Sequence, residues 1–259
     1  MANSTTEPII VTGGCGLLGY HIVQQLLNDS SAGPITVISR SPKTNIFDGV
    51  KYIPGNISDS AFLQTTFNLV KPCVVIHTAS PRLMGENVVD DTWRQVNFEG
   101  TQNLLQAAQE VGTVKAFVLS STVNVIQGRE HYNVVEDAEP YWTPQTKAIP
   151  YWKSKAEQEQ LVLAANSSSL KTVSIRPCLV VGLQEHTLIP AQLKALEEKK
   201  TGVQLGDNKN LLDLISAKNG AKAHLLAMHA LLDPSKANGE VAGEAFNITD
   251  GNPFPFWDI

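Results

Sequence analysis

Short apolar runs rich in β-branched residues alternate with stretches of helical periodicity through the first two-thirds of the chain. The runs are apolar nearly throughout, a pattern typical of strands that are buried on both faces. Six strands are predicted in this way, at Ile9–Thr12, Ile35–Ser39, Val50–Ile53, Val74–Thr78, Ala116–Ser120 and Thr172–Ile175. Alternation of such strands with helices predicts an α/β fold of the Rossmann type, a doubly wound parallel sheet with right-handed crossovers.

The stretches between these runs place apolar residues on one helical face. Leu18, Ile22 and Leu26 share such a face in the first stretch, and a long helix is predicted over Asp91–Val111. After Pro177 the alternation stops. Two further helices are predicted beyond it, at Pro190–Lys200 and Ala217–Leu232.

This change of rhythm divides the chain into two parts. Residues 1–180 are predicted to form a dinucleotide-binding Rossmann domain, and residues 181–259 a substrate-binding lobe packed on it. The sequence stops soon after Phe256 and Trp257, so this lobe is expected to be small and truncated.

The amino-acid composition argues against several classes of function. Hydrophobic residues make up 42% of the 259 positions, enough for a sizeable core. The 20 Lys and Arg against 25 Asp and Glu give a net charge of −5, which argues against nucleic-acid binding. The 3 widely spaced cysteines and the lack of an HExxH pattern favour a cytoplasmic protein with reduced thiols and no metal site. Neither a membrane span nor a secretory leader is expected from the sequence.

A glycine-rich loop follows the first predicted strand and opens the first predicted helix. Gly13, Gly16 and Gly19 have the spacing that lets a chain turn tightly and lets backbone amides approach a pyrophosphate. The first residues of the helix, Leu17 and Leu18, place its positive end at the anion. The loop therefore predicts a dinucleotide site.

The second predicted strand indicates which dinucleotide is bound. An acidic residue at its end would accept hydrogen bonds from both ribose hydroxyls of NAD, but this chain has Ser39 and Arg40 there. A guanidinium and a hydroxyl suit a 2′-phosphate. We therefore expect NADP(H) rather than NAD(H), with an Arg40 that stacks on adenine and tolerates both cofactors as the alternative.

Tyr151 and Lys155 lie one helical turn apart, so the phenol and the ammonium share a face. A nearby ammonium and an oxidised nicotinamide would both lower the pKa of the phenol toward the working range of an acid–base. A tyrosine and a lysine four residues apart are common by chance. Their interpretation as a catalytic pair is strengthened by the Ser120–Thr122 cluster, which lies at the end of a strand that should finish at the ligand-binding edge of the sheet.

These motifs together resemble the extended short-chain dehydrogenases/reductases. Within that superfamily the chain resembles the branch of the 3β-hydroxysteroid dehydrogenases and sterol-4α-carboxylate 3-dehydrogenases, in its fungal-looking form. The matching residues run through the whole chain and include the glycine loop, His77–Ser80, Asn97–Thr101, Ser121 and Thr122, Tyr151 and Lys155, Arg176 and Pro177, and Phe246–Gly251.

The resemblance assigns roles to particular residues. It makes Tyr151 the proton donor or acceptor, gives Lys155 the tasks of lowering its pKa and holding the nicotinamide ribose, and places Thr122 at the substrate oxygen. Other residues are expected to contact the cofactor: Asn56 and Ile57 near the adenine, Thr78, Ala79 and Ser80 along the cofactor channel, and Pro177 near the carboxamide. A homodimer through the helices around 91–111 and 151–165 is also implied.

We therefore expect an NADP(H)-dependent oxidoreductase that interconverts a secondary alcohol and a ketone on an apolar, steroid- or terpenoid-like substrate. An isomerase, epimerase or dehydratase on the same scaffold and a non-catalytic dinucleotide-binding protein are the alternatives. His77 is interpreted as a hydrogen-bonded core histidine. A weaker hypothesis is that an apolar substrate pocket is lined by Trp142, Trp152, Met84, Pro190 and Leu193.

Overall fold

A computed structural model describes residues 7–81, 90–128, 132–137, 140–186 and 188–258 of the chain. Its centre is a 7-stranded sheet in the order β10-β6-β5-β4-β1-β2-β3, and the paired strands run parallel. This confirms the predicted Rossmann-type sheet. The strands are β1 (Ile9–Thr12), β2 (Ile35–Ser39), β3 (Lys51–Pro54), β4 (Val74–His77), β5 (Ala116–Ser120), β6 (Lys171–Pro177) and β10 (Ala245–Ile248).

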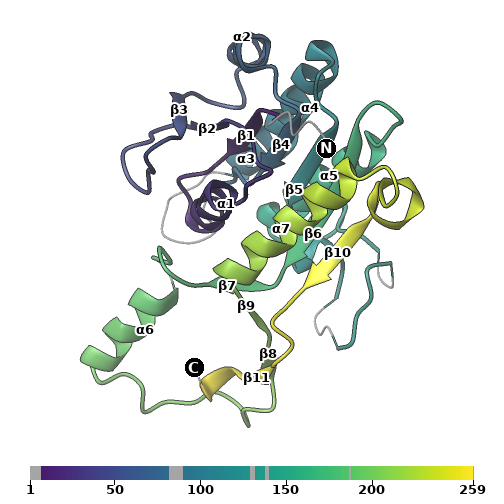
Figure 1. Ribbon diagram of the computed structural model, residues 1–259. Coiled ribbons are helices and arrows are strands. Elements are labelled where there is room, and N and C mark those ends of the chain that lie inside the picture. The colour runs from purple at the N-terminus through teal and green to yellow at the C-terminus, as the bar shows by residue number, and fades with distance from the viewer. Residues whose placement is uncertain (1–6, 82–89, 129–131, 138–139, 187, 259) are drawn as a thin grey trace.

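Helices cover both faces of this sheet (Figure 1). On one face α1 (Leu17–Leu27) packs against α7 (Ala217–Leu232), and on the other α4 (Gly100–Val111) packs against α2 (Ser60–Val70) and α5 (Pro150–Ala164). Successive residues of a strand enter opposite layers, since Ile9 and Val11 belong to the first core and Ile10 to the second. This explains why the strands are apolar throughout.

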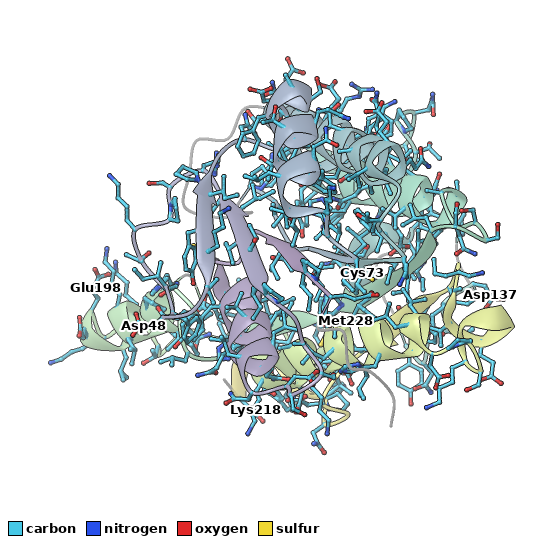
Figure 2. The ribbon with its side chains drawn as sticks, turned by 45° about the horizontal axis from the view of Figure 1, so that its top comes forward. Asp48, Cys73, Asp137, Glu198, Lys218 and Met228 are labelled. Carbon is cyan, nitrogen blue, oxygen red and sulfur yellow. The ribbon has the colours of Figure 1, made fainter. Side chains whose placement is uncertain are left out.

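The first core is formed by β-strand residues together with the inner faces of α1 and α7. Cys73 and Met228 belong to it and lie near the centre of Figure 2, whereas Glu198, just after α6, lies at the periphery. Cys73 is therefore a buried free thiol.

The order of the strands determines where a ligand can bind. β1 pairs with β2 on one side and with β4 on the other, so the direction of winding reverses at this point. Open parallel sheets bind ligands at the carboxyl ends of the strands beside such a reversal. The residues after β1, β4 and β5 therefore surround the expected site.

The long helix predicted over Asp91–Val111 is not regular. It consists of α3 (Asp90–Trp93), a π-helical segment η1 (Arg94–Glu99) and α4. The wider turn brings Asn97 to a fully buried position where its Nδ2 donates to Ser154 Oγ at 3.0 Å. Periodicity alone gave no sign of this segment, because one widened turn barely changes the apolar face.

The residues after 178 contribute to two regions. α7 and β10 complete the central layers, and β10 is a strand that the sequence pattern did not predict. The remaining elements form two small sheets and a separate helix: β7 (Leu179–Val181) with β9 (Leu214–Ser216), β8 (Leu211–Leu212) with β11 (Phe254–Pro255), and α6 (Leu188–Glu197). The division of the chain near residue 180 stays a prediction.

α6 lies away from the central sheet at the lower left of Figure 1. It begins and ends a few residues earlier than the predicted helix over Pro190–Lys200. Three of its large apolar side chains are exposed, those of Ile189, Leu193 and Leu196. Within the described ranges no helix combines the length and the apolar character that crossing a bilayer requires.

Candidate active site

The glycine loop after β1 is shaped for close backbone approach. Gly13 has φ +72°, and a Cβ there would lie 2.7 Å from Ala79 N. A Cβ at Gly19 would lie 2.3 Å from Gly13 O, so only glycine lets α1 pack on the turn. No side chain caps α1 at Gly16, which leaves the first amides of the helix available for an anion. These amides belong to Leu17, Leu18 and Gly19.

The ends of β2 and β3 lie beside this loop. Gly13 N donates to Ile38 O at 2.9 Å, which places Ser39 and Arg40 next to the glycines. Arg40 is exposed, and it forms no ion pair with any residue of the described ranges. Asn56 is exposed after β3, and Ile57 is buried. The four predicted adenosine-side residues therefore lie on adjacent strands at the same edge.

The end of β4 closes the other side of the loop. Thr78 Oγ1 donates to Thr12 O at 2.8 Å, and Thr78 N donates to the same oxygen at 3.1 Å. These bonds hold Ala79 against Gly13. Ser80 is half-buried and follows directly. The predicted channel residues are thus brought against the glycine loop.

Tyr151 and Lys155 are presented by the first turns of α5. Pro150 occupies the first position of this helix, where its missing N–H costs nothing. Lys155 Nζ donates to Ser120 O at 2.7 Å and also to Gln158 Oε1, which fixes the ammonium at the carboxyl end of β5. The structure therefore brings the predicted lysine to the same edge of the sheet as the glycine loop.

Thr122 lies two residues beyond Ser120, at the start of the short 3-10 helix η2 (Val123–Val125). Its Oγ1 accepts a hydrogen bond from Asn124 N at 3.3 Å, so the hydroxyl proton is left free to donate. η2 packs on α5 through contacts that include Val125 and Ala156. Thr122 is buried, whereas the hydroxyl of Ser121 has no partner within the described residues.

Burial dominates the electrostatics of this pair. It raises the pKa of Tyr151 to about 12 and lowers the pKa of Lys155 to about 7, the latter against the opposing effect of the Glu159 carboxylate. The aromatic edge contact with Trp93, at 5.2 Å between ring centroids, adds apolar surroundings to the phenol. In the free protein the phenol is therefore protonated, and the lowering of its pKa by Lys155 and an oxidised nicotinamide stays a prediction for the complex with the cofactor.

Pro177 ends β6 and is buried next to β10. The residue before it, Arg176, donates from Nε and Nη2 to Glu159 Oε1 at 2.9 and 2.7 Å. Both side chains are almost fully buried, at 1% and 0% exposure. This ion pair ties β6 to α5 and so fixes the helix that carries Tyr151 and Lys155.

The structure supports only part of the hypothesis that five residues line an apolar substrate pocket. Trp142 and Trp152 stack with centroids 5.7 Å apart. Pro190 and Leu193 are exposed on α6 and so do not enclose a pocket with them. Met84 lies outside the described residues. The described residues also contain no cluster of His, Cys, Asp or Glu that could bind a metal ion.

Sequence reasoning missed Gln158. It is fully buried and links Lys155 to His77, which is the hydrogen-bonded core histidine that we expected. A glutamine on a helix with many polar residues gives no signal of burial. Only its spacing, three residues after Lys155 and so on the same face, could have drawn attention to it.

A model of the 3-beta hydroxysteroid dehydrogenase/isomerase family matches residues 10–259. Curated relatives include decarboxylating sterol-4-alpha-carboxylate 3-dehydrogenases. That of Schizosaccharomyces pombe is 34% identical over 95% of this chain and 71% of its own length. That of Saccharomyces cerevisiae is 33% identical over 99% and 74%, and the human protein 31% identical over 95% and 63%.

Solved structures share the fold. UDP-glucose 4-epimerase of Thermotoga maritima, with UDP-glucose, superposes with a TM-score of 0.77 at 21% identity, over 97% of this chain and 80% of that one. The Thermus thermophilus UDP-glucose 4-epimerase complex with NAD gives a TM-score of 0.73 at 25% identity, over 95% and 78%. These likenesses show that the chain has the same fold.

Proposed function

Because the chain belongs to the 3-beta hydroxysteroid dehydrogenase/isomerase family, we propose that it is an NADP(H)-dependent oxidoreductase that interconverts a secondary alcohol and a ketone on a steroid-like substrate. The observation that carries this proposal is the position of Lys155. Its ammonium is bonded to Ser120 O, one helical turn from Tyr151 and at the sheet edge that also holds the glycine loop.

The residues at this edge fit a dinucleotide. Glycine at positions 13 and 19 lets the loop lie close against Ala79 and lets α1 begin directly at the turn, and the uncapped start of α1 suits a pyrophosphate. Thr78, Ala79 and Ser80 would line the nicotinamide side, with Pro177 near the carboxamide, while Asn56 and Ile57 would border the adenine. When bound, the nicotinamide would accept or supply the hydride, and its oxidised form would bring a positive charge.

We assign the 2′-phosphate to Ser39 and Arg40. The exposed guanidinium is free for a phosphate, and charge-assisted bonds of this kind are worth about 1.5–3 kcal/mol. Arg40→Ser is therefore expected to weaken NADPH binding about 10- to 100-fold and leave NADH binding unchanged, as measured by calorimetric titration. Lys51→Ser, on the neighbouring strand and also exposed, is the control. Equal affinity of the unaltered protein for NADPH and NADH would refute the assignment.

Acid–base chemistry falls to the chain's own residues. In the direction of oxidation the Tyr151 oxygen takes the hydroxyl proton, and in reduction the phenol donates it. The Lys155 ammonium favours the phenolate through its charge, and the free hydroxyl proton of Thr122 binds the substrate oxygen. Lys155 and Thr122 are buried, which makes their interactions stronger than they would be in water.

The relatives suggest the class of substrate. Their names combine dehydrogenation at position 3 of a sterol with loss of a 4-alpha-carboxylate. A ketone formed beside such a carboxylate is a β-keto acid, which loses carbon dioxide through its enol without a metal or a nucleophile. We therefore assign to this chain the oxidation step alone, on a 3β-hydroxysterol that bears a 4α-carboxylate.

Tyr151→Phe tests the proposal. With NADP⁺ and a 4α-carboxy-3β-hydroxysterol, the variant is expected to lose at least 100-fold in turnover, measured as NADPH absorbance, while it still binds NADPH. Tyr132→Phe, at a residue that is 80% exposed, is the matched control. Wild-type turnover in Tyr151→Phe would refute the mechanism. Consumption of substrate without net NADPH formation would favour the isomerase, epimerase or dehydratase alternative.

A further inference from the structure

Lys155 stands at one end of a chain of buried polar groups that the proposed reaction does not use. Besides Ser120 O, its ammonium donates to Gln158 Oε1, and Gln158 is fully buried. The amide nitrogen of Gln158 donates to Thr101 Oγ1 at 2.8 Å and lies 3.0 Å from His77 Nε2. Because an ammonium can only donate, the oxygen of this amide must face Lys155, and the amide nitrogen faces Thr101 and His77 on the far side.

His77 lies at the far end of this chain. Its Nε2 lies 3.0 Å from Gln158 Nε2 and 2.9 Å from Thr101 Oγ1, and its Nδ1 lies 2.6 Å from Thr12 Oγ1, so both ring nitrogens have a polar partner. Burial, assisted by the Lys155 charge, lowers the pKa of His77 to about 3, so the ring is neutral at working pH. Thr12 directly precedes Gly13 of the glycine loop.

We propose that Gln158, held by Thr101 and the neutral imidazole of His77, is a positioning residue that keeps the Lys155 ammonium charged and aimed at the reacting groups. The inference rests on the function proposed above. Gln158 Oε1 and Ser120 O each accept one of the three ammonium hydrogens of Lys155. No further acceptor for Lys155 is found in the described part of the chain, so one hydrogen is left for a ligand.

Other charged or titratable groups also face this lysine. Glu159 raises its pKa from the same helix, and Tyr151 lies one turn earlier. From the other layer, His224 of α7 senses the lysine charge, and burial keeps that imidazole neutral with a pKa lowered to about 4. Arg176 of β6 faces Glu159 instead. Gln158 is thus the one side-chain acceptor that Lys155 has among the described residues.

Two variants with opposite expectations test the proposal. Gln158→Leu removes the acceptor and is expected to lower the pKa of Lys155 by about 1–2 units, because the charged form loses a hydrogen bond. Gln158→Glu is expected to raise it. Both shifts are measured in the protein without cofactor by NMR titration of labelled lysine. Gln160→Leu, at an exposed site on the same helix, is the control.

The same shifts should appear in catalysis. Activity needs the ammonium, so the alkaline limb of the kcat/KM profile is expected to move to lower pH in Gln158→Leu and to higher pH in Gln158→Glu. The limb belongs to the coupled pair of Tyr151 and Lys155. A residue with a merely structural role would change stability and leave this limb in place.

The outcomes separate the inference from the proposed function. An unchanged Lys155 pKa and an unchanged limb in both variants would overturn the inference while Tyr151→Phe still loses turnover. If Tyr151→Phe is active, the function fails, yet the titration still tests the contact. If Gln158→Leu does not fold, Gln158→Glu decides, since an unchanged Lys155 pKa in that variant overturns the inference.

Discussion

Replacing Glu159 by glutamine is expected to lower the free energy of unfolding by about 3–5 kcal/mol, because the guanidinium of Arg176 would remain buried without a negative partner. The two side chains are 0% and 1% exposed. Glu159 Oε1 accepts from Nε and Nη2 of Arg176, and Oε2 accepts from Ser174 Oγ at 2.6 Å. The carboxylate therefore has three donors, and one of its partners carries a full charge.

The other partners of Arg176 cannot compensate. Glu136 O and the Tyr141 hydroxyl accept from it at 2.8 and 2.7 Å, but both acceptors are neutral. They belong to the segment that connects β5 to α5, so loss of the carboxylate should also loosen this connection. Urea unfolding followed by tryptophan fluorescence measures the effect, since Trp142 and Trp152 lie in the same region.

Glu157→Gln is the matched control, because Glu157 lies on the same helix, is only partly buried and forms no ion pair with a described residue. Its change should stay within about 0.5 kcal/mol. A loss below about 1 kcal/mol in Glu159→Gln would refute the reasoning. The double variant Glu159→Leu with Arg176→Met should recover most of the stability, since an apolar pair leaves no charge unpaired.

Three further predictions concern other parts of the molecule. Gly13→Ala should weaken NADPH binding at least tenfold in calorimetric titration, because the new Cβ would lie 2.7 Å from Ala79 N. The backbone strain of an alanine at φ +72° alone costs about 1–2 kcal/mol, and an unchanged affinity contradicts the prediction. Acidification from pH 6.5 should destabilise the fold, because the pKa values of His77 and His224 in the folded protein lie at about 3 and 4 and the unfolded chain therefore takes up protons first. Each histidine should lower the free energy of unfolding by about 1.4 kcal/mol per pH unit until the pH reaches its folded pKa, and a flat urea-unfolding profile contradicts this. Asp59→Ala should cost about 1 kcal/mol of thermal stability, because the side chain caps α2 by accepting from Phe62 N at 2.9 Å, and an unchanged midpoint contradicts it.

The sheet was predictable because burial on both faces forces a simple pattern on the sequence. Strands β1, β2 and β5 have the predicted bounds, and α7 spans the predicted Ala217–Leu232. β10 was missed because it is an edge strand with half-buried residues, which leaves no continuous apolar run. The π-helical segment was missed because one widened turn leaves the apolar face of a long helix nearly unchanged.

The candidate site was predictable to the extent that it depends on local backbone. The glycine spacing and the pair of Tyr151 and Lys155 follow from local geometry, and the order of the strands brings both to one edge. The surroundings of Lys155 were not predictable. Its lowered pKa arises from burial by distant segments, and its link to His77 runs through Gln158 across a long sequence separation.

The inner face of α5 shows why the surroundings of Lys155 could not be predicted from hydrophobic periodicity and what they contribute to the site. The buried positions of this helix are largely polar, and each has a partner in another element or on the helix itself: Ser154 with Asn97, Lys155 with Ser120 and Gln158, Gln158 with His77 and Thr101, and Glu159 with Arg176 and Ser174. Apolar contacts fix a helix loosely, since they have no preferred direction, whereas hydrogen bonds fix its rotation and its height along the sheet. A helix docked in this way gains little stability from burial. It gains instead a defined position for the phenol and the ammonium that it carries.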